Sequence, residues 1–219
     1  MKCMAYEFVT KSEYTPVRNK FEKIIKEIQK EMKPEYTFQF YLIGSGRKKL
    51  ITREISSNKG FDFDYNFSIQ KIKDKYDSPK LIRENFFKII QEIGKKYGYK
   101  TEDNKSAITI KMVDHEKSKI VHSCDFGIVE DLVDNQENEY QMILVRDKNI
   151  ISPTYVWNER PSSENYSVKL SNIEAAGLWD VLKSEYLKLK NNNKDVDKKS
   201  YQLFIESINN VYNRYDWQD

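Results

Sequence analysis

The chain has 219 residues, of which 39% are hydrophobic and 32% are charged. That length is enough to bury a hydrophobic core, and the spread of aromatic and β-branched residues along the chain excludes an intrinsically disordered protein. The formal net charge is +3, from 37 basic and 34 acidic residues, and so small an excess gives no argument for nucleic-acid binding.

The first part of the chain alternates helix and strand patterns. Thr15-Pro16 supplies an N-cap and a first-turn proline, and apolar residues at helical spacing follow until Lys33-Pro34 ends the helix. Ser78-Pro79 opens a second helix with a clear apolar stripe. Aromatic and β-branched runs predict strands at residues 36–43 and 61–69, with a polar loop at residues 51–60 between them.

The rest of the chain changes from strands to helices near residue 150. Residues 152–170 hold Pro153 and Pro161 and are interpreted as irregular. A capping box at residues 171–174 predicts a helix to about Leu189, and a solvated linker follows it. The remaining predicted elements are strands at residues 106–113, 119–129 and 140–145 and a last amphipathic helix over residues 200–215.

This order of elements predicts an α/β fold of the α+β kind. A small mixed sheet with flanking helices is expected to form one domain over residues 1–150. A helical C-terminal lobe is expected over residues 151–219.

The two cysteines, Cys3 and Cys124, are too few for a disulfide framework or a thiolate zinc site. Both are interpreted as free thiols in a reducing compartment. The first residues lack the apolar run of a signal peptide, and no stretch approaches the ~18 apolar residues of a membrane span. We therefore expect a cytoplasmic protein with no membrane partner.

Two aspartates stand one residue apart in the predicted strand FDFDYNF, residues 61–67. Because side chains alternate across a strand, Asp62 and Asp64 are expected on one face with Cα atoms about 6.5–7 Å apart, and the aromatic residues on the other face, in the core. Two carboxylates so close repel each other, and a divalent cation such as Mg²⁺ removes that cost. The pattern indicates either a metal platform or a solvated strand face that blunts aggregation.

A third carboxylate, Asp125, interrupts the apolar strand VHSCDFGIV. A charge there is costly unless it is exposed or paired. If this strand lies near Asp62 and Asp64, the three carboxylates suffice to hold two Mg²⁺ ions about 3.5–4 Å apart, the geometry of in-line phosphoryl displacement. Mg²⁺, or Mn²⁺ in its place, is therefore the expected cofactor, while a structural or surface role for Asp125 alone stays open.

The strand at residues 36–43 runs directly into Gly44-Ser45-Gly46, with Arg47 and Lys48 next. Glycine lets the backbone turn tightly and approach a ligand, and free N–H groups at a helix start favour a phosphate. The stretch is neither a Walker A loop nor the Rossmann fingerprint. It predicts either a nucleotide-binding turn, with Arg47 and Lys48 adding positive charge, or a plain tight turn followed by a solvated basic run.

Taken together, the Gly44-Ser45 turn, the Asp62-x-Asp64 strand and the later Asp125 strand resemble the nucleotidyltransferase superfamily typified by DNA polymerase beta. The resemblance covers roughly residues 15–146. It implies that Gly44 and Ser45 contact the triphosphate of a nucleotide, that Asp62 and Asp64 bind both metals, and that Asp125 binds the catalytic metal and acts on the acceptor hydroxyl.

The expected function is transfer of a nucleoside monophosphate from an NTP to an acceptor hydroxyl, with release of pyrophosphate. The acceptor stays open among a small molecule, a second nucleotide and an RNA end. A non-catalytic nucleotide-binding or interaction module with the same fold is the alternative.

Five residues outside this pattern have two interpretations each. Tyr155, Trp157 and Arg160 form either a stacking wall for a base or a packing patch between the two lobes. Lys169 and Lys183 either reach a triphosphate or belong to the solvated surface.

Overall fold

The structure is a computed structural model, and it describes residues 5–55, 57–74, 76–147, 153–160, 166–195 and 197–217. The described residues fall into two compact units. The first lies within Val9–Ile51 and Asn58–Arg160, and the second within Met1–Phe8, Thr52–Ser57 and Pro161–Asp219. Cys3, expected to be a free thiol, lies outside the described residues.

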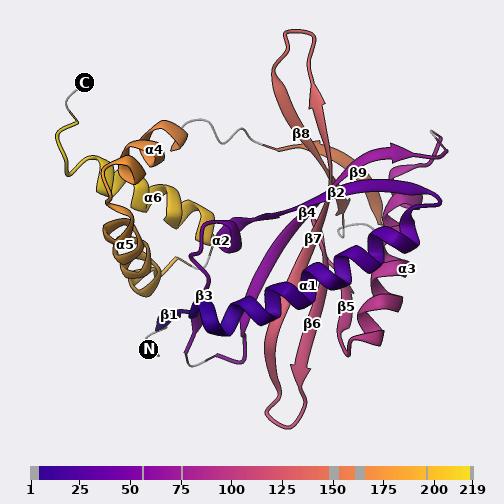
Figure 1. Cartoon of the computed structure of the whole chain (residues 1–219), viewed down its shortest axis with the longest axis horizontal. Helices are drawn as coiled ribbons and strands as arrows, with labels where there is room; N and C mark the ends of the chain where they lie inside the picture. The colour runs from indigo at the N-terminus through magenta and orange to yellow at the C-terminus, as the bar shows by residue number, and fades with distance from the viewer. Residues whose placement is uncertain are drawn as a thin grey trace. The chain divides into compact units, whose positions relative to one another are not determined.

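The first unit is built around a seven-stranded mixed sheet (Figure 1). Strands β4 (Phe61–Ile72) and β7 (Lys119–Val133) pair in parallel, and the other described pairs of this sheet are antiparallel. The strand order is β2-β4-β7-β6-β5, while β8 pairs with β7 and with β9. The bounds of these strands are β2 Tyr36–Ile43, β5 Lys100–Asp103, β6 Ile108–Asp114, β8 Glu139–Asp147 and β9 Thr154–Glu159.

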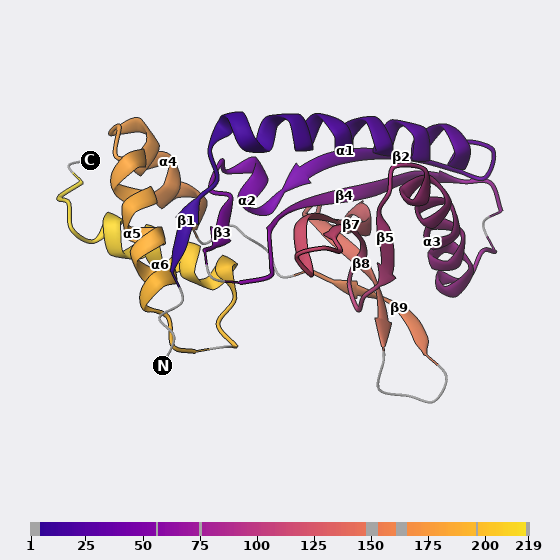
Figure 2. The same cartoon turned by 90° about the horizontal axis from the view of Figure 1, so that it is seen from below.

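Helices α1 (Lys11–Met32) and α3 (Pro79–Lys96) pack on one face of this sheet, as Figures 1 and 2 show. Their apolar stripes form a single core cluster with the aromatic residues of β4. Phe21 of α1 meets Phe63 edge-on at 5.8 Å between ring centroids, and Phe86 of α3 packs on Phe67 at 6.2 Å. This confirms that the aromatic residues of FDFDYNF point into the core, so Asp62 and Asp64 belong to the other face of β4.

The five strands predicted in this unit and the helix after Ser78-Pro79 are confirmed. The predicted start of the first helix at Thr15 is wrong. The helix begins at Lys11, because Thr10 and Glu13 form a complete capping box and Thr10 is the N-cap.

Two strands of this unit were not predicted. Residues 154–159, interpreted as irregular, form β9, and Pro153 precedes the strand, where a missing N–H costs no ladder hydrogen bond. Residues 100–103 form the short polar strand β5 against β6. Residues 154–157 are β-branched or aromatic and favour a strand, but they lie between two prolines, whereas β5 is mostly polar and depends on its pairing with β6.

In the second unit, β1 (Tyr6–Phe8) and β3 (Thr52–Glu54) pair antiparallel. The prediction of a polar loop throughout residues 51–60 is therefore wrong at β3. Three helices complete the unit: α4 (Ser167–Ala175), α5 (Trp179–Asn192) and α6 (Ser200–Tyr212). Their buried apolar residues are Ile173, Leu182, Tyr186, Leu203, Phe204, Ile208 and Val211.

The single helix predicted from residue 171 to about Leu189 is also wrong. Residues 171–174 lie inside α4, and Gly177, at a φ of 69°, separates α4 from α5. A left-handed residue at this point ends a helix, as glycine commonly does. The last predicted helix is confirmed as α6. None of the described helices is both long and apolar enough to cross a membrane.

Candidate active site

The three predicted carboxylates come together on the sheet face opposite α1 and α3. In the parallel pairing of β4 and β7, Asp64 stands directly opposite Asp125. Neighbouring strands are about 4.8 Å apart, so these two side chains are adjacent on one face. Asp62 precedes Asp64 by two residues and shares that face. The structure thus brings together the DxD pair and the third aspartate, which lie 61 positions apart from Asp64 to Asp125 in the sequence.

The electrostatics of the face show how strongly these groups interact. Burial, followed by the charges of Asp62 and Asp125, raises the pKa of Asp64 to about 7, although Arg160 and Lys48 oppose the rise. Burial likewise raises the pKa of Asp125, opposed by a hydrogen bond from Thr109. Asp62 itself is exposed. Repulsion between neighbouring carboxylates is what a bound cation relieves.

The glycine turn lies beside the same carboxylates. Ile43, the last residue of β2, pairs with Asp64, so Gly44 follows directly next to it. Gly44 has a φ of 60°, and a Cβ atom there would lie 2.5 Å from Asp64 Oδ2. Only glycine is compatible with both this backbone conformation and this close approach.

Residues Gly44–Arg47 form the short helix α2. The Ser45 carbonyl accepts a hydrogen bond from the Leu50 amide at 2.9 Å, which closes the turn. Arg47 is exposed, whereas Lys48 is half-buried. Burial and then Arg47 lower the pKa of Lys48, while the charge of Asp64 raises it. Of the two predicted basic residues, Lys48 therefore shares the electrostatic environment of the carboxylates.

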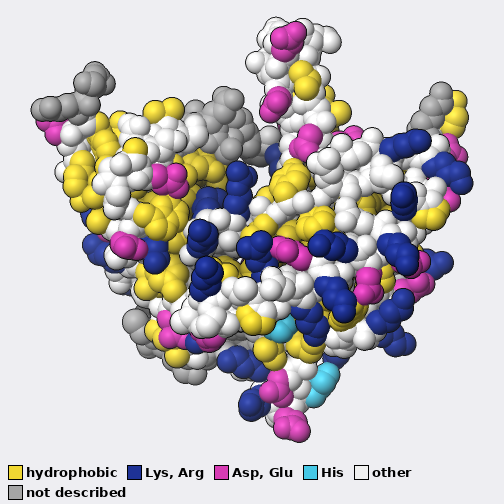
Figure 3. All heavy atoms as spheres, in the orientation of Figure 1, with side chains coloured by type: hydrophobic (Ala, Val, Ile, Leu, Met, Phe, Trp, Pro, Cys, Tyr) yellow, Lys and Arg dark blue, Asp and Glu magenta, His cyan; other side chains and the backbone are white. Residues whose placement is uncertain are grey.

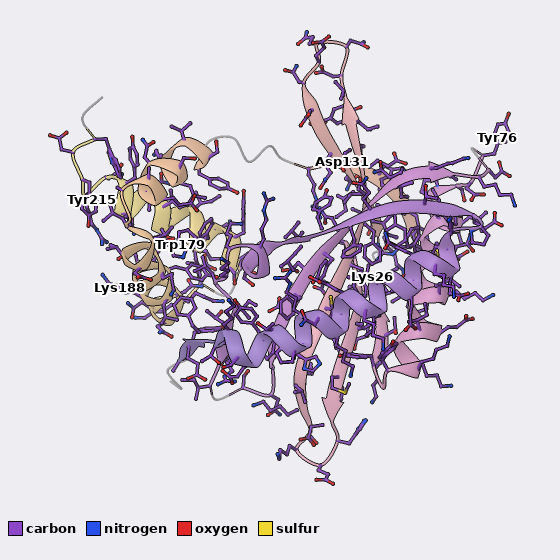
Figure 4. All side chains as sticks on the ribbon, viewed as in Figure 1. Lys26, Tyr76, Asp131, Trp179, Lys188 and Tyr215 are labelled. Carbon is purple, nitrogen blue, oxygen red and sulfur yellow. The ribbon has the colours of Figure 1, made fainter. Side chains whose placement is uncertain are left out.

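A buried polar network continues along this face beyond Asp64. Asn66 and Ser68, the next residues of β4 on the same side, are 2% and 1% exposed. Arg160 donates to Asn66 Oδ1 at 3.3 Å and to Gln141 Oε1 at 2.8 Å. Gln141 donates to Asp131, which Figure 4 labels at the base of the β7–β8 hairpin. The sequence did not reveal this network. Its one signal was Asn66, a polar residue directly after DFDY in a strand that is otherwise rich in aromatic residues.

Arg160 thus forms hydrogen bonds within this polar network, whereas Tyr155 and Trp157 pack against the hydrophobic core of the first unit. Their packing therefore lies within one unit, whereas the interpretation from the sequence was packing between lobes. In the second unit, Lys169 donates to Asn209 at 2.7 Å, and Lys183 lies over the Phe8 ring and 3.5 Å from Asp180.

His122 and Cys124 face the core, on the opposite side of β7 from Asp125. The Nε2 atom of His122 is 2.9 Å from the Tyr99 hydroxyl, and Cys124 is fully buried. Burial lowers the pKa of His122 to about 4 and raises the pKa of the Cys124 thiol well above its usual value. Neither side chain reaches the carboxylates, as the alternation of strand residues predicts.

In the part of the chain that the structure describes, no three His, Cys, Asp or Glu side chains already converge in a geometry that holds a metal ion. Asp62, Asp64 and Asp125 occupy adjacent positions without meeting at one point. Adjacent like charges repel, and drawing their oxygens together requires a cation between them. All three supply hard carboxylate oxygens, the donors that Mg²⁺ prefers, so the residues fit such an ion.

The face of the molecule in Figure 3 carries charges of both signs. On the face shown in Figure 3, Lys and Arg side chains are dispersed among acidic and uncharged ones. This agrees with the small net charge of the chain.

No protein-family model and no curated protein matches the sequence. Several solved structures match at the level of the fold. The Vibrio cholerae cyclic AMP-GMP synthase DncV, described as a prokaryotic cGAS homolog, matches with a TM-score of 0.59 and 12% identity over 99% of this chain and 70% of that chain. CdnG, a CD-NTase from Bradyrhizobium diazoefficiens in complex with GTP, matches with a TM-score of 0.58 and 13% identity over 94% of this chain and 67% of that chain.

The 3'-deoxy ATP bound form of Vibrio cholerae DncV matches with a TM-score of 0.55 and 14% identity over 96% of this chain. The fold is a nucleotidyltransferase fold. The resemblance found in the sequence is therefore confirmed at the level of the fold. The present chain spans 54% of the length of that DncV chain.

Proposed function

We propose that the protein is a Mg²⁺-dependent nucleotidyltransferase that moves a nucleoside monophosphate from an NTP to an acceptor hydroxyl. The observation that carries the proposal is the pairing of Asp64 with Asp125 across β4 and β7, with Asp62 on the same face and Gly44 against Asp64. A nucleotidyltransferase fold in which three carboxylates and a glycine turn occupy adjacent positions on one sheet face is poorly explained by a purely structural role.

Asp62, Asp64 and Asp125 would hold two Mg²⁺ ions. Bound there, the ions would supply charge neutralisation for the triphosphate and the leaving group, as in other phosphoryl transfers. The three carboxylates, rather than histidine or cysteine, are suited to this role because their oxygens are hard ligands.

Residues of the chain itself would bind the triphosphate and accept the proton. The backbone of Gly44 and Ser45 would receive the triphosphate, and Lys48 would add positive charge beside it. Asp125 would take the proton of the acceptor hydroxyl as the hydroxyl oxygen attacks the α-phosphorus. The bond from that phosphorus to the bridging oxygen then breaks, and pyrophosphate leaves. A carboxyl group whose pKa burial raises is a better proton acceptor than an ordinary aspartate.

A nucleotide is the acceptor that the comparisons favour. The neighbours include a cyclic AMP-GMP synthase and structures in complex with GTP and 3'-deoxy ATP. Joining two nucleotides requires a nucleotide hydroxyl as the acceptor, whereas small molecules and RNA ends have no support among these neighbours.

The test is pyrophosphate release from each NTP with Mg²⁺, by the wild type and by the double variant Asp62→Asn/Asp64→Asn. We expect the variant to lose activity by at least about 10³-fold, since the carboxylates are the proposed ligands of the ions. Glu84→Gln, which removes an exposed carboxylate of α3, is the matched control and should keep full activity.

Two outcomes would overturn the proposal. Turnover retained in the double variant would remove the carboxylates from the chemistry. A wild type whose melting temperature rises with Mg²⁺ and an NTP, but which releases no pyrophosphate under any acceptor condition, would be a binding module instead.

A further inference from the structure

The third carboxylate has a partner that the sequence did not reveal. Thr109 of β6 stands opposite Asp125 of β7 in the antiparallel pairing of these strands, so both side chains are on the same face. Its Oγ1 lies 2.6 Å from Asp125 Oδ1, and the residue is 4% exposed. Asp64, Asp125 and Thr109 therefore form one row across three adjacent strands.

The direction of this hydrogen bond is determined by a second one. The side-chain amide of Asn104 donates to Thr109 Oγ1 at 2.8 Å. A hydroxyl has a single hydrogen, and with a donor already directed at its oxygen that hydrogen points to the Asp125 carboxylate. A hydroxyl that donates to an ionised carboxylate at this distance makes a strong, charge-assisted hydrogen bond.

The backbone of Asn104 is itself held in place. Its main-chain carbonyl accepts a hydrogen bond from Arg83 at 2.8 Å, and its main-chain N–H donates to the Ala107 carbonyl at 3.0 Å. Arg83 is fully buried in α3. The buried Arg83 thus anchors the backbone of Asn104, and the side chain of Asn104 in turn donates to Thr109, which donates to Asp125.

One oxygen of Asp125 is therefore committed to Thr109, which fixes the rotation of the carboxylate about its Cβ–Cγ bond. The other oxygen, Oδ2, is the one left to meet a ligand. Hydrogen-bonded partners of metal-binding carboxylates act in this way, because they orient the ligand.

We propose that Thr109 is a positioning residue for Asp125, whose carboxylate it orients so that Oδ2 faces the metal site. The inference rests on the proposed function, because it assigns Asp125 to that site. Thr109 touches neither the nucleotide nor the acceptor, and it acts only through Asp125.

The chain offers a matched control in Thr101. This residue lies on β5, the strand next to β6, and its buried hydroxyl has no hydrogen-bond partner within the described residues. Thr101→Val and Thr109→Val make the same chemical change in adjacent strands, yet only the second removes a hydrogen bond to a carboxylate.

The experiment measures Mn²⁺ binding by isothermal titration calorimetry and, separately, kcat and KM for pyrophosphate release with Mg²⁺. We expect Thr109→Val to weaken Mn²⁺ binding by about tenfold and to lower kcat with little change in KM for the NTP. Thr109→Ser, which keeps the hydroxyl, should restore both to within about twofold, and Thr101→Val should behave like the wild type.

Asn104→Asp keeps the test decisive if Thr109→Val fails to fold. The new carboxylate accepts the Thr109 hydrogen and draws it away from Asp125, so Mn²⁺ binding should weaken, although the added negative charge alone would strengthen it.

Unchanged Mn²⁺ binding in Thr109→Val, or equal losses in Thr109→Val and Thr101→Val, would overturn the inference. A wild type that neither binds Mn²⁺ nor releases pyrophosphate would instead overturn the proposed function.

Discussion

Gly44 lies so close to Asp64 that the position has no room for a side chain. A Cβ atom would lie 2.5 Å from Asp64 Oδ2, and the φ of 60° is itself unfavourable for any residue with a Cβ. A second glycine, Gly177, has a similar φ of 69°, but no described heavy atom lies within 4 Å of the place where its Cβ would be. Alanine at either glycine would strain the backbone, but only alanine at Gly44 would also displace the Asp64 carboxylate.

Gly44→Ala should therefore lower activity by about 100-fold, because misplacing a catalytic group by an ångström has that order of effect. Gly177→Ala should cost only the left-handed backbone penalty, about 1–2 kcal/mol in the free energy of unfolding, and keep full activity. Urea unfolding and pyrophosphate release of both variants check this. Equal activity of the two variants would mean that Gly44 serves the turn alone.

Among the elements, α3 is attached to the sheet by a fully buried arginine. Arg83 donates through Nη2 to Asp103 of β5 at 2.7 Å and through Nη1 to the Leu144 carbonyl of β8 at 3.1 Å. Asp103 also pairs with Arg146 at 3.3 Å. The arginine therefore joins α3 to a polar strand that lacks strand propensity and to β8.

Arg83→Met should lower the free energy of unfolding by about 3–5 kcal/mol, because it removes the buried half of an ion pair, leaves Asp103 with Arg146 alone, and leaves the Leu144 and Asn104 carbonyls without this donor. Arg18→Met removes an exposed pair with Glu22 on α1 and should cost at most about 0.5 kcal/mol. Chemical unfolding followed by circular dichroism measures both. A loss below about 1 kcal/mol in Arg83→Met would show that the buried pair adds little to stability.

For the whole molecule, two buried groups make the pH dependence of stability run in opposite directions. The pKa of His122 is lowered to about 4, so the unfolded chain binds more protons between about pH 6.5 and 4, and stability falls with falling pH. The pKa of Asp64 is raised to about 7, so the native state binds more protons between about pH 7 and 4, and stability rises with falling pH. The wild-type curve alone cannot separate them, but a variant can.

We expect the stability difference between wild type and His122→Gln to change with pH. Glutamine does not titrate, so the wild type should lose up to about 3 kcal/mol relative to the variant between pH 7 and pH 4. Urea unfolding at several pH values measures the difference. A difference that stays constant over this range would show that His122 titrates normally in the folded protein.

Much of the fold and of the site could be predicted from local chemistry. The alternation in FDFDYNF assigned the aromatic residues to the core and Asp62 and Asp64 to the other face, because the period of a strand is two. Gly44 and Asp125 could be recognised for a different reason. Glycine and aspartate are depleted in strands, and these two residues stand at the end of one predicted strand and inside another.

Predictions failed where a neighbour decides the conformation. Strands β5 and β9 form because β6 and β8 present unpaired edges to them. The first helix begins after the N-cap Thr10, whereas the prediction chose the later Thr15-Pro16 as its start. The second unit joins Tyr6–Phe8 to Thr52–Glu54, a pairing with no local signature.

The sequence by itself determined which residues carry charge on the site face and which face the core, since strand periodicity is a local property. The tertiary structure alone decided that Asp64 and Asp125 are register partners, that Gly44 touches Asp64, and that Thr109 donates to Asp125. Those contacts join strands far apart in the chain, and their register depends on packing the whole sheet against α1 and α3, which no single segment encodes.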